Sequence, residues 1–153
     1  MIIGTQTAPE RQFDFWIGNW ECSGPSRTAP GKDEWTETKA QNRIERAFNG
    51  KVIQENFKMD GLNGMSVSVY SPAKKKWEQT WVDDQGSYFA LSGEFKDGKM
   101  VLMTNRNPAA PKQFGRMTFH NITENSFTWD WEGTTDGGKT WSLNWQLLYK
   151  RNE

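Results

Sequence analysis

The sequence predicts an all-β fold, a single antiparallel up-and-down β-barrel of about ten strands with a short N-terminal helix closing one end. Three observations predict it. Pairs typical of hairpin turns recur along the chain, among them Asn49-Gly50, Asp60-Gly61 and Asp97-Gly98. The runs between these turns alternate apolar and polar side chains, and no second helical pattern follows the first. A barrel is favoured over a sandwich because a closed meander leaves no sheet edges.

Residues 8–17 are expected to form the helix. The segment Thr7-Ala8-Pro9-Glu10 matches a capping box with proline in the first turn. Phe13 and Trp16 follow at helical spacing, and Gly18 supplies a stop. The aromatic face of this helix needs an open apolar end to cover, so we expect it to plug the barrel.

Strands are expected from about residue 19 to residue 150, and residues 1–153 are expected to form one domain because no linker or composition shift divides them. Each strand is a run of alternating residues bounded by turn signals. The expected strands are 19–26, 34–48, 51–59, 64–71, 76–83, 87–96, 99–106, 113–121, 126–133 and 140–150.

Alternation also assigns the inward face of several strands, since successive side chains of a strand point to opposite sides. Both phases of 51–59 stay open, with either Ile53, Glu55 and Phe57 or Val52, Gln54 and Asn56 inward, and the phase of 87–96 is undecided. The expected inward residues elsewhere are Thr36, Thr38, Ala40, Asn42 and Ile44; Trp77, Gln79, Trp81 and Asp83; Phe127, Trp129 and Trp131; and Trp141, Leu143, Trp145, Leu147 and Tyr149.

Charge and cysteine content limit the partners. Lys+Arg and Asp+Glu both number 19, which argues against nucleic acid or an anionic membrane as the main partner, because both attract a basic excess. No run approaches the roughly 18 apolar residues of a membrane span. Cys22 is alone, so neither an intrachain disulfide nor a cysteine-based metal site is expected. We expect a cytoplasmic protein; an exported form whose signal has been removed stays open.

The hydrophobic residues are unusual in kind. They make up only 35% of the chain, yet aromatics make up 14% and nine residues are Trp. Rings supply large rigid areas and line cavities well. Polar residues on the inward face, such as Asn42, Gln79 and Asp83, would each cost about 1–3 kcal/mol if buried without a partner. An interior that holds water or a ligand explains both features.

Several motifs together resemble a known family. They are FDFW-x-G-x-W from Phe13, Gly64-x-Ser66 leading to Tyr70-Ser71-Pro72, Lys76-Trp77-x-Gln79-x-Trp81-Val82-Asp83, and Asp136-Gly137-Gly138-Lys139-Thr140-Trp141. The chain resembles, from about Phe13 to Arg151, an uncharacterised bacterial family labelled domain of unknown function 1579 (DUF1579).

The chain is also similar to the calycins, which include lipocalins, fatty-acid-binding proteins and nitrobindin-type barrels. In these proteins a short helix precedes a Gly-x-Trp motif, and the Trp packs against a basic residue of the last strand. The resemblance implies those parts for Gly18-Asn19-Trp20 and for Lys150 or Arg151.

The leading interpretation is a protein that binds a small apolar or aromatic molecule in a Trp-lined lumen. The rings would supply stacking area, and the polar residues would orient the ligand through hydrogen bonds. The candidate ligand-binding residues are Asn42, Tyr70, Trp77, Gln79, Trp81, Asp83, Trp129, Trp131 and Trp145.

The alternative is a small isomerase, lyase or cyclase that uses acid–base residues in the same cavity. Its candidates are Glu55, Asp83, Tyr70 and His120, with Arg116 holding an anion. Asp83 instead caps the turn at 84–86 in a competing interpretation. No clustered metal ligands are present, so neither a metal nor another cofactor is expected.

The single histidine leaves three roles open. His120 is a haem ligand of the nitrobindin kind, a general base, or a partly solvated residue at a strand end.

Two further features have structural interpretations. The segment 134–141 fits the Asp-box pattern, which we interpret as a hairpin turn, with the Asp136 carboxylate accepting backbone N–H groups. Trp35 falls on an outward face and would mark a homodimer contact. A third interpretation of the whole chain, a small stress or assembly protein in which the aromatics are only core, also stays open.

Overall fold

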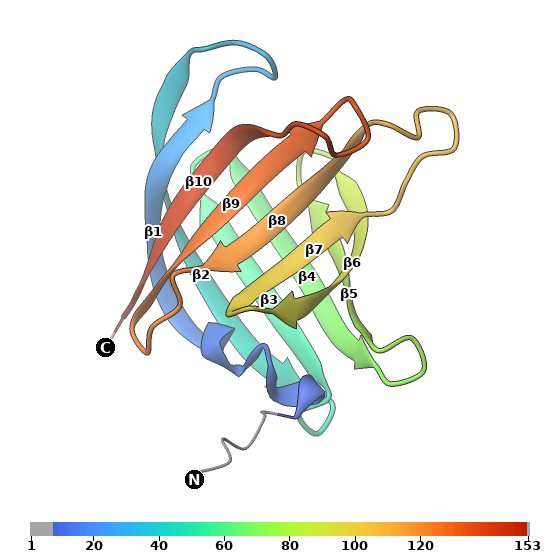
Figure 1. Cartoon of the computed structure of the whole chain (residues 1–153). Coiled ribbons are helices and arrows are strands. Elements are labelled where there is room, and N and C mark those ends of the chain that lie inside the picture. Colours follow the sequence, from blue (N-terminus) through green and yellow to red (C-terminus); the bar gives the residue numbers. More distant parts are fainter. Residues whose placement is uncertain (1–7, 153) are drawn as a thin grey trace, which may run out of the picture.

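Ten antiparallel strands close into a barrel in the computed structural model, which describes residues 8–152 (Figure 1). Each strand pairs with its neighbours in sequence, and β1 pairs with both β2 and β10, which closes the sheet. The predicted fold class is therefore confirmed. The strands are β1 Gly18–Arg27, β2 Trp35–Ala47, β3 Val52–Met59, β4 Leu62–Ser71, β5 Lys76–Asp83, β6 Tyr88–Lys96, β7 Lys99–Thr104, β8 Phe114–His120, β9 Ser126–Thr134 and β10 Ser142–Arg151.

The turn dipeptides act as predicted in their backbone geometry. Asn49 and Gly50 have φ values of 59° and 80°, and Asp97 and Gly98 have 54° and 75°. Both positions of such a pair need positive φ, which Asn, Asp and Gly tolerate better than other residues. In the pair Asp60-Gly61 the positive φ, 81°, belongs to the glycine. These turns set the register of the strands that they join.

The predicted N-terminal helix takes a different form, two separate 3₁₀ turns. They are η1 (Pro9–Arg11) and η2 (Asp14–Trp16). Phe13 interrupts them, with φ −97° and ψ 7°. The predicted capping residue Thr7 lies outside the described residues. Two short turns direct both Phe13 and Trp16 into the barrel, where they are 0% and 1% exposed, and this packing outweighs the preference for a continuous helix.

The N-terminal turns run across the lower end of the barrel in Figure 1, between the start of β1 and the turn that joins β2 and β3. The Phe13 ring stacks on Trp16, with ring centroids 4.9 Å apart. It also meets Trp77 and Phe119 edge to face at 5.1 and 5.2 Å. We call this segment, residues 9–16, the plug.

Arg151 at the end of β10 fastens the plug to the sheet. Its guanidinium lies 4.2 Å above the ring of Trp20 and donates to the carbonyl oxygens of Ile17 and Phe15 at 2.7 and 3.3 Å. Trp20 in turn donates from Nε1 to the Trp16 carbonyl at 2.8 Å. The Trp–basic pair expected from the calycin resemblance is therefore present, and Arg151 is its basic member. Gly18 has φ 137°, which glycine adopts more readily than other residues, and a Cβ there would lie 2.2 Å from the guanidinium and displace it.

The observed burial settles the inward faces. In β3 the inward residues are Ile53, Glu55 and Phe57, the first of the two predicted phases. In β6 Leu91 is buried and its neighbours are partly exposed.

The predicted inward face of β10 is wrong at its start, where Trp141 and Leu143 were expected to point inward. A β-bulge between Leu143 and Trp145 shifts the register, so Leu143 pairs with the outward Glu132 while Trp145 pairs with the inward Trp131. The extra residue of a bulge reverses the phase of the strand. Trp141 instead stacks beneath the outward guanidinium of Arg116, 3.9 Å from its ring centroid.

The segment 134–141 forms the predicted hairpin turn. The Asp136 carboxylate accepts hydrogen bonds from the hydroxyl and backbone N–H of Thr140, at 2.6 and 2.9 Å, and from the Thr134 hydroxyl at 2.9 Å. These hydrogen bonds lower the pKa of Asp136 to about 2. The motif therefore serves the fold.

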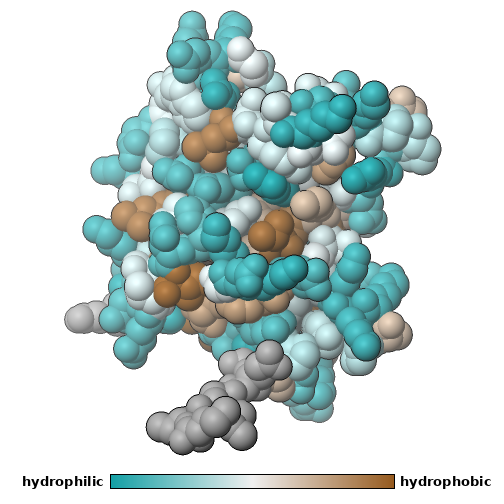
Figure 2. Space-filling model, in the orientation of Figure 1, coloured by the Kyte–Doolittle hydropathy of each residue, from teal (hydrophilic) through white to brown (hydrophobic). Residues whose placement is uncertain are grey.

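The outer surface is largely hydrophilic on the face that Figure 2 draws, with apolar residues in separate patches. Trp35 is outward as predicted, and 38% exposed. Its role as a dimer contact stays a prediction. Over residues 8–152, no helix has the length and apolar character that crossing a bilayer requires.

Candidate functional site

A partly open cavity of about 130 Å³ lies inside the barrel above the plug. Nine of its fifteen lining residues are aromatic. Leu62, Asp83 and Phe89 come from the strand ends that lie away from the plug, so we call that side the mouth. Trp16 of the plug belongs to the opposite side, which we call the floor. The lining residues are Trp16, Glu55, Phe57, Leu62, Trp81, Asp83, Phe89, Leu91, Met117, Phe119, Trp129, Trp131, Trp145, Leu147 and Tyr149.

The rings of the wall stand nearly perpendicular to one another. Trp145 meets Phe57 at 89° and Trp129 at 87°, with centroids 5.8 and 5.3 Å apart. Phe57 also meets Trp81 at 69°. Edge-to-face contact between aromatic neighbours is a favourable geometry. This arrangement forms corners in the cavity wall that expose ring faces as well as ring edges to the cavity.

Hydrogen bonds and glycines fix the orientation of these rings. Trp145 donates from Nε1 to the Thr38 hydroxyl at 2.9 Å, and that hydroxyl donates to the Gly24 carbonyl at 2.7 Å. A Cβ at Gly64 would lie 2.2 Å from the ring of Trp81, so the ring covers the bare backbone of β4. The wall is therefore preorganised.

A buried carboxyl group, Glu55 of β3, belongs to the same cavity. Its Oε1 accepts from the Ser66 hydroxyl and its Oε2 from the Asn42 amide, both at 2.7 Å. The Asn42 amide also donates to the Tyr149 hydroxyl at 3.0 Å. Glu55 is 7% exposed. Burial raises the pKa of its carboxyl group above the ordinary value of 4.5, and the hydrogen bonds from Ser66 and Asn42 oppose this only in part.

Several buried polar atoms of the barrel have no hydrogen-bond partner among residues 8–152. They are Asn42 Oδ1, Gln79 Oε1 and the indole nitrogens of Trp16 and Trp77. Gln79 uses its amide nitrogen to donate to the Ser68 hydroxyl at 3.0 Å. Trp16 lines the cavity, and its indole N–H is one of these unpartnered groups. Unpartnered buried polar atoms are uncommon and call for an occupant such as water or a ligand.

A second carboxyl group, Asp83, stands at the mouth. Partial desolvation works against its ionisation, but hydrogen bonds from the Trp81 indole and from the backbone of Ser87 and Gln85 outweigh it and lower its pKa. The Trp81 nitrogen lies 2.9 Å from Asp83 Oδ2. The other oxygen caps the turn, accepting from the N–H groups of Gln85 and Ser87 at 3.0 Å each. Asp83 therefore combines its two predicted placements, cavity wall and turn cap.

The remaining predicted ligand-binding residues divide between the cavity and the core. Trp81, Asp83, Trp129, Trp131 and Trp145 line the cavity. Asn42 and Gln79 are buried on the inner face but do not line the cavity. Asn42 is connected to the cavity by its hydrogen bond to Glu55, whereas Gln79 donates to Ser68. Trp77 and Tyr70 pack edge to face with centroids 5.8 Å apart, and Trp77 contacts the plug at Phe13. These last two belong to the closed end of the barrel.

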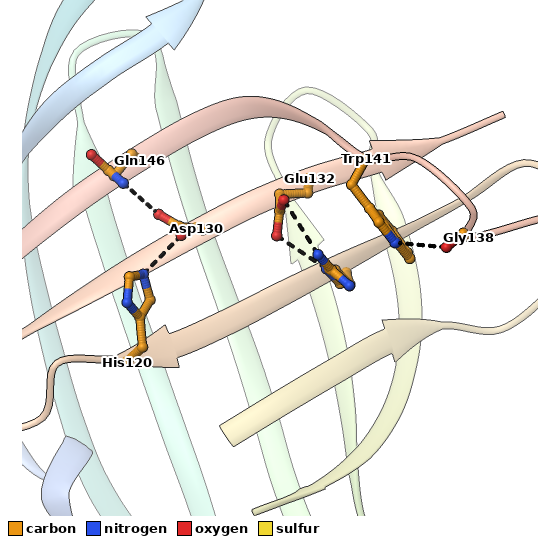
Figure 3. A network of polar contacts seen from close by, with 7 residues as sticks. His120, Asp130, Glu132, Gly138, Trp141 and Gln146 are labelled. Carbon is orange, nitrogen blue, oxygen red and sulfur yellow. Dashed lines mark hydrogen bonds and ion pairs between the residues drawn. The ribbon is translucent and has the colours of Figure 1, made fainter. Parts of the chain in front are cut away.

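His120 and Arg116 lie on the outside of the barrel, which corrects their predicted place among the acid–base residues of the cavity. Met117 and Phe119 of β8 point inward, so alternation turns Arg116 and His120 outward. His120 lies 2.8 Å from Asp130, which also accepts from the Gln146 amide at 2.8 Å (Figure 3). Arg116 donates to both oxygens of Glu132, at 3.0 and 3.4 Å. An outward His120 cannot ligate a haem in the lumen.

Sequence reasoning missed several residues of the site. Tyr149 and Thr38 were placed inward, but no role followed from the sequence, because their partners Asn42 and Trp145 come from distant strands. Phe57, Phe89 and Met117 line the cavity from strands whose faces were undecided or not assigned. Among the described residues, no three or more His, Cys, Asp or Glu side chains gather in a way that could hold a metal ion.

The sequence model of a family described as "Protein of unknown function (DUF1579)" matches residues 5–150. No curated protein matches the chain.

Proposed function

We propose that this chain, which belongs to the DUF1579 family, binds a small, largely apolar or aromatic molecule in the cavity of its calycin-like barrel. The observation that carries the proposal is the partly open cavity whose lining is mostly rings and includes one deeply buried carboxyl group. A core that served only stability would be closely packed and would contain no buried carboxyl group without a charged partner, because both features cost free energy.

The size of the cavity limits the ligand. Its volume of about 130 Å³ is close to the roughly 150 Å³ of an engineered apolar cavity that admits benzene. A single ring or a compact branched group fits; a long fatty acyl chain exceeds it. The ligand would lie against the faces of Trp129, Trp131 and Trp145 and direct its polar end toward Glu55.

Native mass spectrometry of the protein purified from its own host tests the proposal. A native mass that exceeds the denatured mass by one small-molecule increment would identify an occupant. Calorimetric titration with phenol then measures the cavity directly, because phenol is one neutral ring with one hydroxyl group. We expect saturable 1:1 binding.

Two variants of the same kind separate the cavity from the surface. Leu62→Trp adds bulk at the mouth, whereas Leu148→Trp adds the same bulk on the outer face, where Leu148 is 40% exposed. We expect the first to lose phenol binding and the second to keep it, with equal circular dichroism spectra. Equal affinity in both variants, or no binding and no bound mass in the wild type, would refute the proposal.

A second candidate function, a small acid–base enzyme, is favoured by one observation. Glu55 and Asp83 line one cavity, and their environments move their pKa values in opposite directions. Such a pair supplies a proton donor and a proton acceptor at the same pH. Turnover of a bound ligand that ceases in both Glu55→Gln and Asp83→Asn would support this function; unchanged turnover in both would exclude it.

A further inference from the structure

We infer that the occupant of the cavity is a compact organic cation, such as a protonated or quaternary amine, held against the indole faces and between the carboxyl groups of Glu55 and Asp83. This inference rests on the proposed function and names the charge class of its ligand.

The charge of the cavity lining favours a cationic ligand. Glu55 and Asp83 are acidic, and none of the lining residues in the described part of the chain is basic. The basic residues of the adjacent strand β8 cannot compensate, because Arg116 and His120 face outward and contact Glu132 and Asp130 at 3.0 and 2.8 Å. An anionic ligand would therefore meet two carboxyl groups and no counter-charge.

The hydrogen bonds that Glu55 accepts come from neutral groups. Its contacts with Ser66 and Asn42 are to neutral groups, so no charged side chain of the barrel pairs with it. Buried carboxylates are normally paired with a cation or a metal. The two donors occupy one position on each oxygen and leave further lone pairs free to accept from a ligand. Among the described residues, Glu55 is thus a buried acceptor without a positive partner.

The aromatic rings of the cavity wall also favour a cation. A cation over the face of an aromatic ring is attracted by the ring quadrupole, and Trp is the strongest partner. Trp129 and Trp145 stand at 87° to each other, and Phe57 closes the next corner at 89° to Trp145. A corner of aromatic rings of this kind therefore binds an ammonium group more tightly than an anionic or a purely apolar group of similar size.

Titration of Glu55 supports the same assignment. Burial raises its pKa, so a cation that binds beside it promotes loss of the proton. Cys22 and Tyr149 face Glu55 from β1 and β10, and burial raises the pKa of both, so they stay neutral and supply no positive charge. Asp83 is the other charged group of the cavity, and it is ionised near neutral pH. Cation affinity should therefore increase with pH below the native pKa of Glu55, by up to about tenfold per pH unit.

Three probes of nearly the same shape test the inference by calorimetric titration of the full chain. They are choline, its neutral carbon analogue 3,3-dimethylbutan-1-ol, and the anion 3,3-dimethylbutanoate. We expect choline to bind about tenfold more tightly than the alcohol, and the anion not to bind. Glu55→Gln and Asp83→Asn should each reduce the preference for choline over the alcohol. Glu94→Gln, which removes a carboxylate from the exposed outer face of β6, should leave it unchanged.

The outcomes distinguish the two proposals. If the alcohol binds as tightly as choline, or if only phenol binds, the cation inference is overturned while the proposed function stands. If neither phenol nor any of the three probes binds and no bound mass is found, the proposed function fails and the inference fails with it. A choline preference that persists unchanged in the double variant Glu55→Gln/Asp83→Asn would overturn the assignment of these two residues.

Discussion

Replacing Glu55 with glutamine should stabilise the protein at high pH and leave its stability almost unchanged at low pH. Burial raises the pKa of Glu55 in the folded state above 4.5. The unfolded chain therefore releases its proton first as pH increases. Folding stability contributed by this residue is fully present below pH 4.5 and is lost as pH rises through the native pKa. Glutamine does not titrate, so Glu55→Gln removes this loss.

The hydrogen bonds of the site set the size of the effect. Glutamine can accept from the Asn42 amide and donate to the Ser66 hydroxyl, which turns to accept, so both 2.7 Å contacts are kept in shape. The difference in unfolding free energy between the variant and the wild type should then grow by about 1.4 kcal/mol per pH unit between pH 4.5 and the native pKa. In contrast, Glu55→Ala leaves two buried donors without an acceptor and should cost about 2–4 kcal/mol.

Urea denaturation at a series of pH values, followed by tryptophan fluorescence, measures this difference. The control is Glu94→Gln, since Glu94 is an exposed carboxylate. Its difference from the wild type should stay flat over the same pH series. A flat difference for Glu55→Gln as well, or one that shrinks as pH rises, would refute the reasoning that Glu55 is buried without a charged partner.

Three other substitutions probe the plug, the turn and the wall. Arg151→Ala should lower the unfolding free energy, measured by urea denaturation, by about 2–3 kcal/mol, because it removes hydrogen bonds to the plug and the contact with Trp20. Arg151→Lys should recover less than half of this loss, since lysine lacks the planar guanidinium group. The pKa of Asp136 is lowered from 3.8 to about 2, so Asp136→Asn should be less stable than the wild type above pH 3.8, and thermal melts should converge as pH falls toward 2. Gly64→Ala places a Cβ 2.2 Å from the Trp81 ring, so it should lower the unfolding free energy by about 1–3 kcal/mol and weaken phenol binding. Wild-type stability together with wild-type phenol affinity would show that the wall is not preorganised.

Most of the barrel could be predicted because its signals are local. Alternation over 76–83 and the positive-φ pairs at 49–50 and 97–98 each depend on a few neighbouring residues, and each agrees with the structure. The closing pair of β1 and β10 was expected from the edge-free meander and the calycin resemblance, and it places Arg151 beside Trp20. A chain whose local signals agree in this way specifies one fold.

The error in β10 has a local cause that a sequence does not display. A bulge adds one residue and reverses the side to which Leu143 points, while Trp141 lies before the strand begins at Ser142. The short N-terminal helix predicted over 8–17 is present, and packing of Phe13 and Trp16 in the barrel end gives it the form of two 3₁₀ turns.

The candidate site could be predicted only in part. Trp81, Trp129, Trp131 and Trp145 lie on strands with clear alternation, and all four line the cavity. The carboxyl network needs Asn42, Glu55 and Ser66 from three strands, and no spacing in the sequence brings them together. His120 attracted attention as the single histidine, although rarity says nothing about the direction of a side chain.

The fastening of the plug by Arg151 also bears on how the chain is made. During synthesis Phe13, Trp16 and Trp20 are made well before Arg151, the residue that holds them. The strand β1 likewise lacks its partner β10 until the strands β2 to β9, which lie between them in sequence order, have been made. A large aromatic surface therefore stays uncovered over that interval, and barrel closure is a long-range step of the kind that slows folding and favours aggregation. Nascent chains stopped before residue 151 should consequently bind chaperones more strongly than chains that include it, which pull-down from a translation extract would measure.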